Sequence, residues 1–330
     1  MEQTQSTEIG LVLYPGAQQS AVLGLTDLFR VTNRFVASHR DAAKPALRVT
    51  HWQQVEAEQP PACVFDSWPG SPPGTFAALV LPPTLDEPVV ADDVRILATW
   101  LSEHHATGVV LASVCAGAFP LAATGLLSGR RMTTHWSYAD LLQQRFKDVR
   151  VDVDQLIIDD GDIITAGGLM AWTDLGLKLV DRLLGSSAMI ATARMLLVDP
   201  AGREQRHYTV FSPRLTHGDA AILKVQHWLQ ATQAQEVSLA ALVAQAGLEE
   251  RTFLRRFQKA TGFTSTEYCQ RLRVGRAREL LQFSNNPIDR VAWEVGYSDP
   301  GAFRKIFTRI VGLAPSEYRR RFSAGHTPAT

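Results

Sequence analysis

The spacing of apolar residues changes near residue 185 and again near residue 219. In the first part, short apolar runs end at turn-forming residues, which is typical of buried strands; these runs are residues 9–14, 47–52, 77–81 and 109–114. Apolar residues recur with helical spacing over 22–36, 94–101, 119–127 and 175–184, and 156–165 reads as a hairpin. Strands that alternate with helices predict an α/β domain, a parallel sheet flanked by helices.

Residues 186–220 lose this periodicity and contain Pro200, Gly202, Pro213 and Gly218, so we expect a linker there. From residue 221 onward the strand signals stop, and helical spacing alone remains to about residue 323. The pattern therefore predicts an α/β domain at 8–185 and an all-α domain at 221–323, and 330 residues agree with two domains.

The C-terminal third repeats itself with an offset of 50 residues. The matched pairs are Phe253/Phe303, Phe257/Phe307, Gly262/Gly312, Glu267/Glu317 and Tyr268/Tyr318. Each copy reads as a helix, a tight turn and a second helix, at 239–261 and 288–311, and a long helix over 266–283 connects them. This is the plan of the helix-turn-helix motif, whose second helix enters the major groove of DNA.

Basic residues are concentrated in the same region. The whole chain has a formal net charge of +0, but residues 222–325 hold 16 Lys and Arg against 9 Asp and Glu. In the second helix of each copy, phenylalanines mark the core face and basic residues occupy other faces. We expect these residues to bind DNA: Arg251, Arg255, Arg256, Arg304, Lys305 and Arg309. A solvated basic face on a helical bundle is the alternative, which a repeated pattern disfavours.

Residues 288–307 (IDRVAWEVGYSDPGAFRKIF) and 312–319 (GLAPSEYR) resemble the AraC/XylS family of transcription regulators. The resemblance covers about 100 residues and implies double-stranded DNA as a partner, with RNA polymerase as a further candidate partner. It places the base-reading positions at Arg251 and Arg255 in the first copy, and near Pro300, Gly301, Arg304 and Lys305 in the second. Because proline and glycine offer no side-chain donor, readout in the second copy falls to Arg304 and Lys305.

Small residues surround Cys115 between a predicted strand and a predicted helix, in the sequence Cys115-Ala116-Gly117. This arrangement is typical of a nucleophile elbow, and a helix N-terminus favours the thiolate. His135 is a candidate base. The alternative is an inert buried thiol beside a core histidine, because free cysteine is often a small core residue. The residues alone leave both interpretations open.

Five motifs resemble the ThiJ/PfpI superfamily, which has a flavodoxin-like fold of the class I glutamine amidotransferase type: LYPG (13–16), GLTDLF (24–29), SVCAG (113–117), GRRMTTHW (129–136) and TAGG (165–168). The resemblance assigns the elbow cysteine to Cys115 and the nearby histidine to His135. Catalytic members of the superfamily also place a carboxylate against the cysteine, and this chain has Ala21 at that position. Asp27 lies two helical turns away from Ala21, so we do not expect it to replace this carboxylate. The missing proton acceptor argues against catalysis, but not against a ligand cleft.

The two resemblances together point to the GlxA subgroup, in which the N-terminal domain senses amino-acid-like or quaternary-ammonium metabolites. We therefore expect a transcription regulator and not an enzyme, with a small-molecule effector and a homodimeric assembly. The candidate effector contacts are Cys115, Ala116, His135, Asp27 and Trp136. The alternative is a hydrolase, a lyase or a redox sensor that uses Cys115 and His135.

The remaining features favour a cytoplasmic protein without cofactor or metal. Cys63, Cys115 and Cys269 lie far apart, so neither a disulfide framework nor zinc spacing is present. Residues 1–9 lack the pattern of a signal peptide. Residues 106–129 carry no charge, but Pro120 and several glycines favour a strand, a turn and a buried helix over a membrane span.

Overall fold

The structure, a computed structural model, describes residues 7–37, 45–56, 58–71, 74–199, 204–235 and 237–323. The chain divides into two compact units, Met1–Gln205 and Arg206–Thr330. Among the described residues, no helix combines the length and the apolar character that crossing a membrane requires. The uncharged segment 106–129 contains a strand and a short helix instead.

A seven-stranded sheet forms the centre of the first unit, with strand order β3-β2-β1-β4-β5-β9-β8. Its strands are β1 (Thr7–Leu13), β2 (Leu47–Gln53), β3 (Ala62–Asp66), β4 (Phe76–Leu81), β5 (Val110–Val114), β8 (Ile157–Asp159) and β9 (Ile163–Ala166). The five central strands are parallel, while β3 and β8 are antiparallel edge strands. A separate parallel pair joins β6 (Arg131–Met132) to β7 (Arg150–Val151). The predicted parallel sheet and the hairpin are confirmed.

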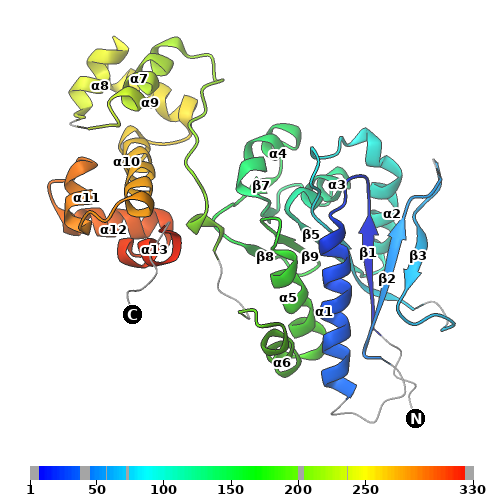
Figure 1. Cartoon of the computed structure of the whole chain (residues 1–330). Helices are drawn as coiled ribbons and strands as arrows, with labels where there is room; N and C mark the ends of the chain where they lie inside the picture. Colours follow the sequence, from blue (N-terminus) through cyan, green and yellow to red (C-terminus); the bar gives the residue numbers. More distant parts are fainter. Residues whose placement is uncertain are drawn as a thin grey trace, which may run out of the picture. The chain divides into compact units, whose positions relative to one another are not determined.

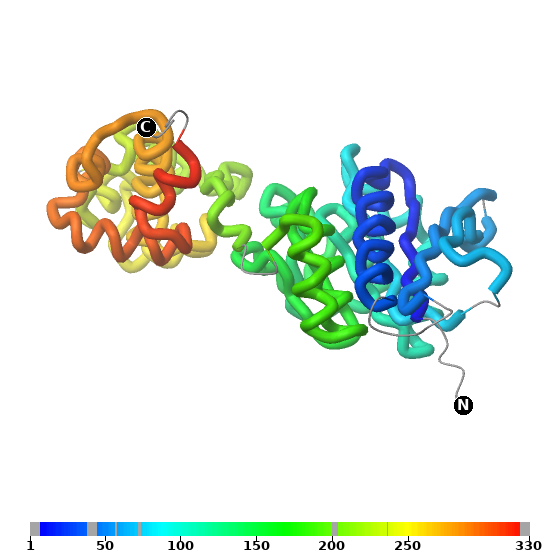
Figure 2. Tube along the Cα trace, turned by 60° about the horizontal axis from the view of Figure 1, so that its bottom comes forward, coloured from blue at the N-terminus to red at the C-terminus, as the bar shows by residue number. Residues whose placement is uncertain are grey.

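Helices cover both faces of this sheet (Figure 1). They are α1 (Gln19–Ala37), α2 (Arg95–Ala106), α3 (Ala118–Ala123), α4 (Ala139–Arg145), α5 (Trp172–Leu184) and α6 (Ser186–Leu196). Helices α1, α5 and α6 pack together on one face, whereas α2 and α3 contact each other on the other side (Figures 1 and 2). Gly24 permits the close packing of α1 on α5, because a Cβ there would lie 2.4 Å from the Trp172 ring.

Helix α6 lies where the sequence predicted the start of a linker. Its small residues Ala188, Thr192 and Ala193 are buried, and the Thr192 hydroxyl lies 3.0 Å from that of Thr32 on α1. The sequence pattern missed this helix because Gly185 interrupts the preceding helical period and its buried face consists of small side chains. The ordered part of the first unit therefore extends beyond residue 185. Strand β3 was also missed, because none of its five residues is buried.

The described residues of the second unit form helices joined by loops, without a β-strand (Figure 2). They are α7 (Ala220–Ala231), α8 (Leu239–Ala246), α9 (Glu250–Thr261), α10 (Ser265–Phe283), α11 (Ile288–Glu294), α12 (Pro300–Val311) and α13 (Pro315–Phe322). The pairs α8–α9 and α11–α12 occupy the two predicted helix-turn-helix segments. Gly262 and Gly312 end α9 and α12 with φ of 80° and 83°, the left-handed conformation that glycine adopts most easily.

Each copy of the motif has its own hydrophobic core, and α10 contributes to both. The first core includes Leu229, Leu242, Phe253, Phe257 and Tyr268. The second includes Val274, Leu281, Val291, Phe303, Phe307 and Tyr318. The N-terminal half of α10 thus belongs to the first core and its C-terminal half to the second.

Candidate nucleic-acid interface and effector pocket

Helix α9 is held by one buried face, which leaves its basic side chains outside. Phe253, Phe257 and Ala260 are buried on this face. Arg251 and Arg255 are exposed, and within the described residues neither guanidinium forms an ion pair or a hydrogen bond. Both side chains are therefore available to an external anion such as a DNA phosphate, or to a guanine edge.

Arg256 has a different environment from its two neighbours. Its Nε and Nη2 donate to the two carboxylate oxygens of Asp219 at 2.9 and 2.7 Å, and Asp219 also caps the start of α7. These hydrogen bonds lower the pKa of Asp219. Arg256 therefore fastens α9 to α7. The sequence offered no signal for this pair, because Asp219 lies 37 residues away.

Helix α12 repeats the packing of α9 but not its free cations. Lys305 is exposed without a partner among the described residues. The Arg304 guanidinium pairs with Asp289 of α11, and Arg309 Nη2 donates to Gln270 Oε1 at 2.6 Å. Asp299 caps the helix, since its two carboxylate oxygens accept the N–H groups of residues 301 and 302 at 2.8 and 3.1 Å.

The predicted elbow forms at the end of β5. Cys115 has a φ of 55°, a left-handed conformation that is rare for residues other than glycine. Gly117 is required behind it, because a Cβ there would lie 2.4 Å from the carbonyl oxygen of Leu81. The side chain of Cys115 is buried, and burial raises its pKa to about 11 despite backbone hydrogen bonds from Ala116, Gly168 and His135. The thiol is therefore protonated at neutral pH.

The groups that would activate this thiol are missing or engaged elsewhere. Ala21 is completely buried and provides no carboxylate. The His135 Nδ1 accepts the Ser137 N–H at 3.2 Å and lies 2.7 Å from the Ser137 hydroxyl, and burial lowers the pKa of His135. Asp27 is exposed on α1. The structure thus brings Cys115, Ala116 and His135 together, whereas the Asp27 side chain faces solvent.

Gln205 is a buried residue of this site that sequence reasoning missed. Its Nε2 donates to the carbonyl oxygens of Thr134 and Val153 at 2.9 and 3.1 Å, and its Oε1 accepts the Trp136 N–H at 3.0 Å. Thr134 in turn donates its hydroxyl to the carbonyl of Cys115 at 2.7 Å. Gln205 therefore braces the segment that contains His135 and Trp136, although it lies in the predicted linker.

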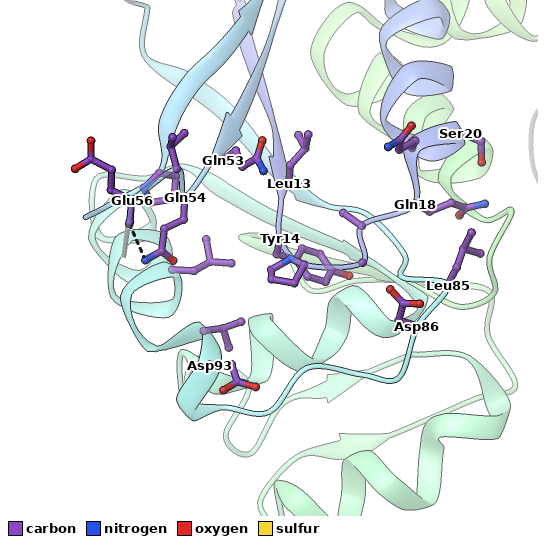
Figure 3. Close-up of a pocket in the computed structure, with 18 residues that line it drawn as sticks. Leu13, Tyr14, Gln18, Ser20, Gln53, Gln54, Glu56, Leu85, Asp86 and Asp93 are labelled. Carbon is purple, nitrogen blue, oxygen red and sulfur yellow. Dashed lines mark hydrogen bonds between the residues drawn. The ribbon is translucent and has the colours of Figure 1, made fainter. Parts of the chain in front are cut away.

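A pocket of about 950 Å³ opens at the carboxyl ends of β1 and β2 (Figure 3). Parallel sheets usually bind ligands at this edge. Tyr14 lies in the middle of the view, and its hydroxyl donates to the carbonyl of Pro82. The lining includes the carboxylates Glu56, Asp86 and Asp93, and none of the described residues that line the pocket is a lysine or an arginine. The five candidate effector residues are not part of this lining, so the sequence did not predict this pocket.

Comparison with known proteins agrees with both units. Residues 67–182 match the DJ-1/PfpI family and residues 242–321 match a helix-turn-helix domain. The transcriptional regulator GlxA of Rhizobium meliloti is 28% identical over 71% of this chain and 72% of its own length. The regulator CdhR of Pseudomonas aeruginosa is 23% identical over 95% of this chain and 92% of its own length.

These comparisons support a DNA-binding transcription regulator of the AraC type. Its N-terminal unit is a DJ-1/PfpI-like domain, as the resemblance predicted. Among solved structures, an AraC family transcriptional regulator from Pseudomonas putida is 17% identical, with a TM-score of 0.45, and covers 58% of this chain and 99% of its own. The described residues of the chain contain no group of three or more His, Cys, Asp or Glu side chains that could hold a metal ion.

Proposed function

We propose that this AraC-family protein binds specific duplex sites through both helix-turn-helix motifs, and that its DJ-1/PfpI-like domain binds a small metabolite and forms a homodimer. The observation that carries the first part is the duplicated pattern of buried phenylalanines with basic side chains on the outer faces. Of the six residues predicted to contact DNA, Arg251, Arg255 and Lys305 are exposed and lack a partner within the described residues, so they are the first candidates for DNA contact.

The state of the elbow supports metabolite binding over catalysis. A nucleophilic thiol needs a low pKa or a nearby base, but Cys115 is buried with a pKa of about 11, and Ala21 stands where a carboxylate would be needed. The backbone N–H groups of Ala116 and Gly168 point to the sulfur, and such donors suit a carboxylate group equally well. The acidic pocket beside Tyr14 suits a positively charged group. The proposed effector, an amino-acid-like or quaternary-ammonium metabolite, carries such a positively charged group.

The alternative is a cysteine-dependent enzyme or a redox sensor. Both require an accessible thiolate at position 115. Iodoacetamide labelling tests this alternative directly. We expect Cys115 to react more slowly than the exposed Cys63, and labelling faster than that of an unfolded thiol at neutral pH would favour the alternative.

Electrophoretic mobility shifts with the full chain test DNA binding. The probes are the promoter regions that neighbour its own gene, and the salt concentration is varied. We expect retardation at low salt that weakens as salt rises, because phosphate contacts release counterions. Folded protein that retards no probe at low salt would contradict the proposed function.

A thermal-shift screen with amino acids, betaines and polyamines tests effector binding. A ligand at about 100 times its Kd stabilises a folded protein by about 2.7 kcal/mol, which such a screen detects. The Cys115→Ser variant should retain the shift, because binding does not need a thiolate. Loss of the shift in this variant, with unchanged melting of the free protein, would point to thiol chemistry. Analytical ultracentrifugation of the full chain tests the dimer.

A further inference from the structure

The two motifs of the DNA-binding unit are connected by polar contacts at the middle of α10. The buried residues of the first core end on this helix at Cys269, and those of the second begin at Val274. Arg273 lies between them. A single helix can bend or twist, so the two cores alone leave the angle between α9 and α12 loosely specified.

Arg273 contacts the α7–α8 connection, which contributes to the first core, and the turn of the second motif. Its Nε donates to the carbonyl oxygen of Ala234 at 2.8 Å, in the connection between α7 and α8. Its guanidinium carbon lies 5.5 Å from the centre of the Tyr297 ring, and a Cβ at Gly296 would lie 3.5 Å from it. Gly296 and Tyr297 lie in the turn between α11 and α12, so one side chain connects the first core to the turn of the second motif.

The connection that Arg273 holds has an unusual backbone. Gln233 and Ala234 have φ of 52° and 54°, and Ala234 is completely buried. Two successive non-glycine residues in this conformation cost free energy and persist only where surrounding contacts hold them. The hydrogen bond from Arg273 is one such contact, and the burial of Ala234 in the first core is another.

A second contact bridges the motifs beside Arg273. Gln235 follows this backbone directly, and its Nε2 donates to the carbonyl oxygen of Glu294 at 2.9 Å. Glu294 is the last residue of α11. The hydrogen bond between Arg309 of α12 and Gln270 of α10 adds a third polar contact near the same junction. These contacts connect the ends of the two motifs without extending either core.

We propose that Arg273, supported by Gln235, is a positioning residue that fixes the separation and rotation between α9 and α12. It would thereby set the spacing of the two DNA half-sites that the protein accepts. This inference rests on the proposed function, because it concerns two recognition helices on one duplex. Arg273 itself is assigned no contact with DNA.

The experiment uses duplexes that the full-length wild-type protein selects from a random pool. Affinity is then measured on the selected duplex and on duplexes with two base pairs inserted between the half-sites, which rotates one half-site by about 70°. We expect the insertion to weaken wild-type binding about tenfold or more. We expect Arg273→Ala to bind the selected duplex more weakly than the wild type does. For this variant, the insertion should reduce the affinity further by threefold or less.

Arg276→Ala is the matched control. It removes the same charge from the same helix, and the Arg276 guanidinium pairs with Glu279 one turn away, 2.7 Å between Nη1 and Oε2. This variant should keep the wild-type spacing dependence. Arg273→Lys should restore part of it, since lysine can donate to Ala234 but lacks the planar group that lies against Tyr297.

The outcomes separate this inference from the proposed function. If Arg273→Ala weakens binding equally at both spacings, Arg273 does not set the spacing and the inference is wrong. If Arg273→Ala does not fold, Gln235→Ala replaces it, because this exposed side chain can be shortened without opening a core. If the two-base-pair insertion then weakens binding of Gln235→Ala as much as it weakens binding of the wild type, the inference is wrong. If the wild-type protein selects no duplex, the proposed function fails instead.

Discussion

The two helix-turn-helix motifs share their packing but differ in their free cations. In the first motif, Arg251 and Arg255 are exposed without described partners, while Arg256 is held by Asp219. In the second motif, Arg304 pairs with Asp289, and Lys305 remains free. The two copies therefore share their buried core residues but differ in the basic side chains on their outer faces. Since arginine can contact guanine with two hydrogen bonds and lysine acts as a point charge, we expect the first motif to read bases more strongly.

The largest expected effect tests the part that the motifs share. Phe257→Ala and Phe307→Ala each remove a completely buried ring, and we expect each to lower the free energy of unfolding by about 3–5 kcal/mol. Urea unfolding followed by circular dichroism measures this loss. Leu254→Ala, at a partly exposed position of α9, is the control and should cost far less. A small loss for one phenylalanine alone would show that the two cores are not equivalent.

The next effect tests how the motifs differ on DNA. Arg255→Ala should cost about 1–3 kcal/mol of binding free energy and relax the preference at one base pair. Lys305→Ala should weaken binding to all sequences alike and reduce the salt slope by about 1. Fluorescence anisotropy with base-substituted duplexes and several salt concentrations measures both variants. If instead Lys305→Ala loses the base preference and Arg255→Ala weakens binding to all sequences alike, the second motif and not the first reads the bases.

A smaller effect concerns the helix starts. Asp299 accepts two backbone N–H groups at the start of α12, whereas Glu249, at the matching position before α9, forms no side-chain cap. Asp299→Ala should therefore destabilise the protein by about 0.5–2 kcal/mol. Glu249→Ala is the matched control and should change stability little. Thermal or urea unfolding compares the two, and equal losses would mean that the Asp299 cap contributes nothing specific.

The smallest effect is a pH dependence that comes from the pair of Arg256, in the first motif, with Asp219. Hydrogen bonds from Arg256 hold the pKa of Asp219 below its ordinary value. The pair therefore stabilises the fold above the ordinary carboxyl pKa, and this stabilisation is lost as pH falls through the lower folded-state pKa. Arg256→Met should lower the melting temperature at neutral pH, and its difference from wild type should shrink in acid. Arg251→Met should show no such trend, and a difference that grows in acid would contradict the pair.

Sequence periodicity predicted the repeated and strongly apolar parts of the fold well. The Phe-x3-Phe pattern and the terminal glycines placed α9 and α12, because local spacing alone determines which face is buried. It missed α6, whose buried face consists of alanine and threonine, and β3, which has no buried residue. Neither element has a buried face of large apolar side chains, which is the feature that periodicity reports.

The candidate sites were predictable by residue type but not by environment. Sequence placed six basic residues on the recognition helices, yet the partners of Arg256 and Arg304 lie 37 and 15 residues away and have no local signature. The elbow at Cys115 followed from a strand that runs into small residues. The brace by Gln205 could not be predicted, because a polar residue in a weakly periodic segment carries no signal for burial.

Hydroxyl-radical footprinting of the full-length protein on its selected duplex tests the central claim, that both motifs bind one duplex in successive major grooves. For each bound chain, the account predicts a pair of protected windows about one helical turn apart. Arg255→Ala should weaken the window of the first motif more than the other. A single protected window in the wild-type protein, or two windows that respond equally to Arg255→Ala and Lys305→Ala, would contradict the account.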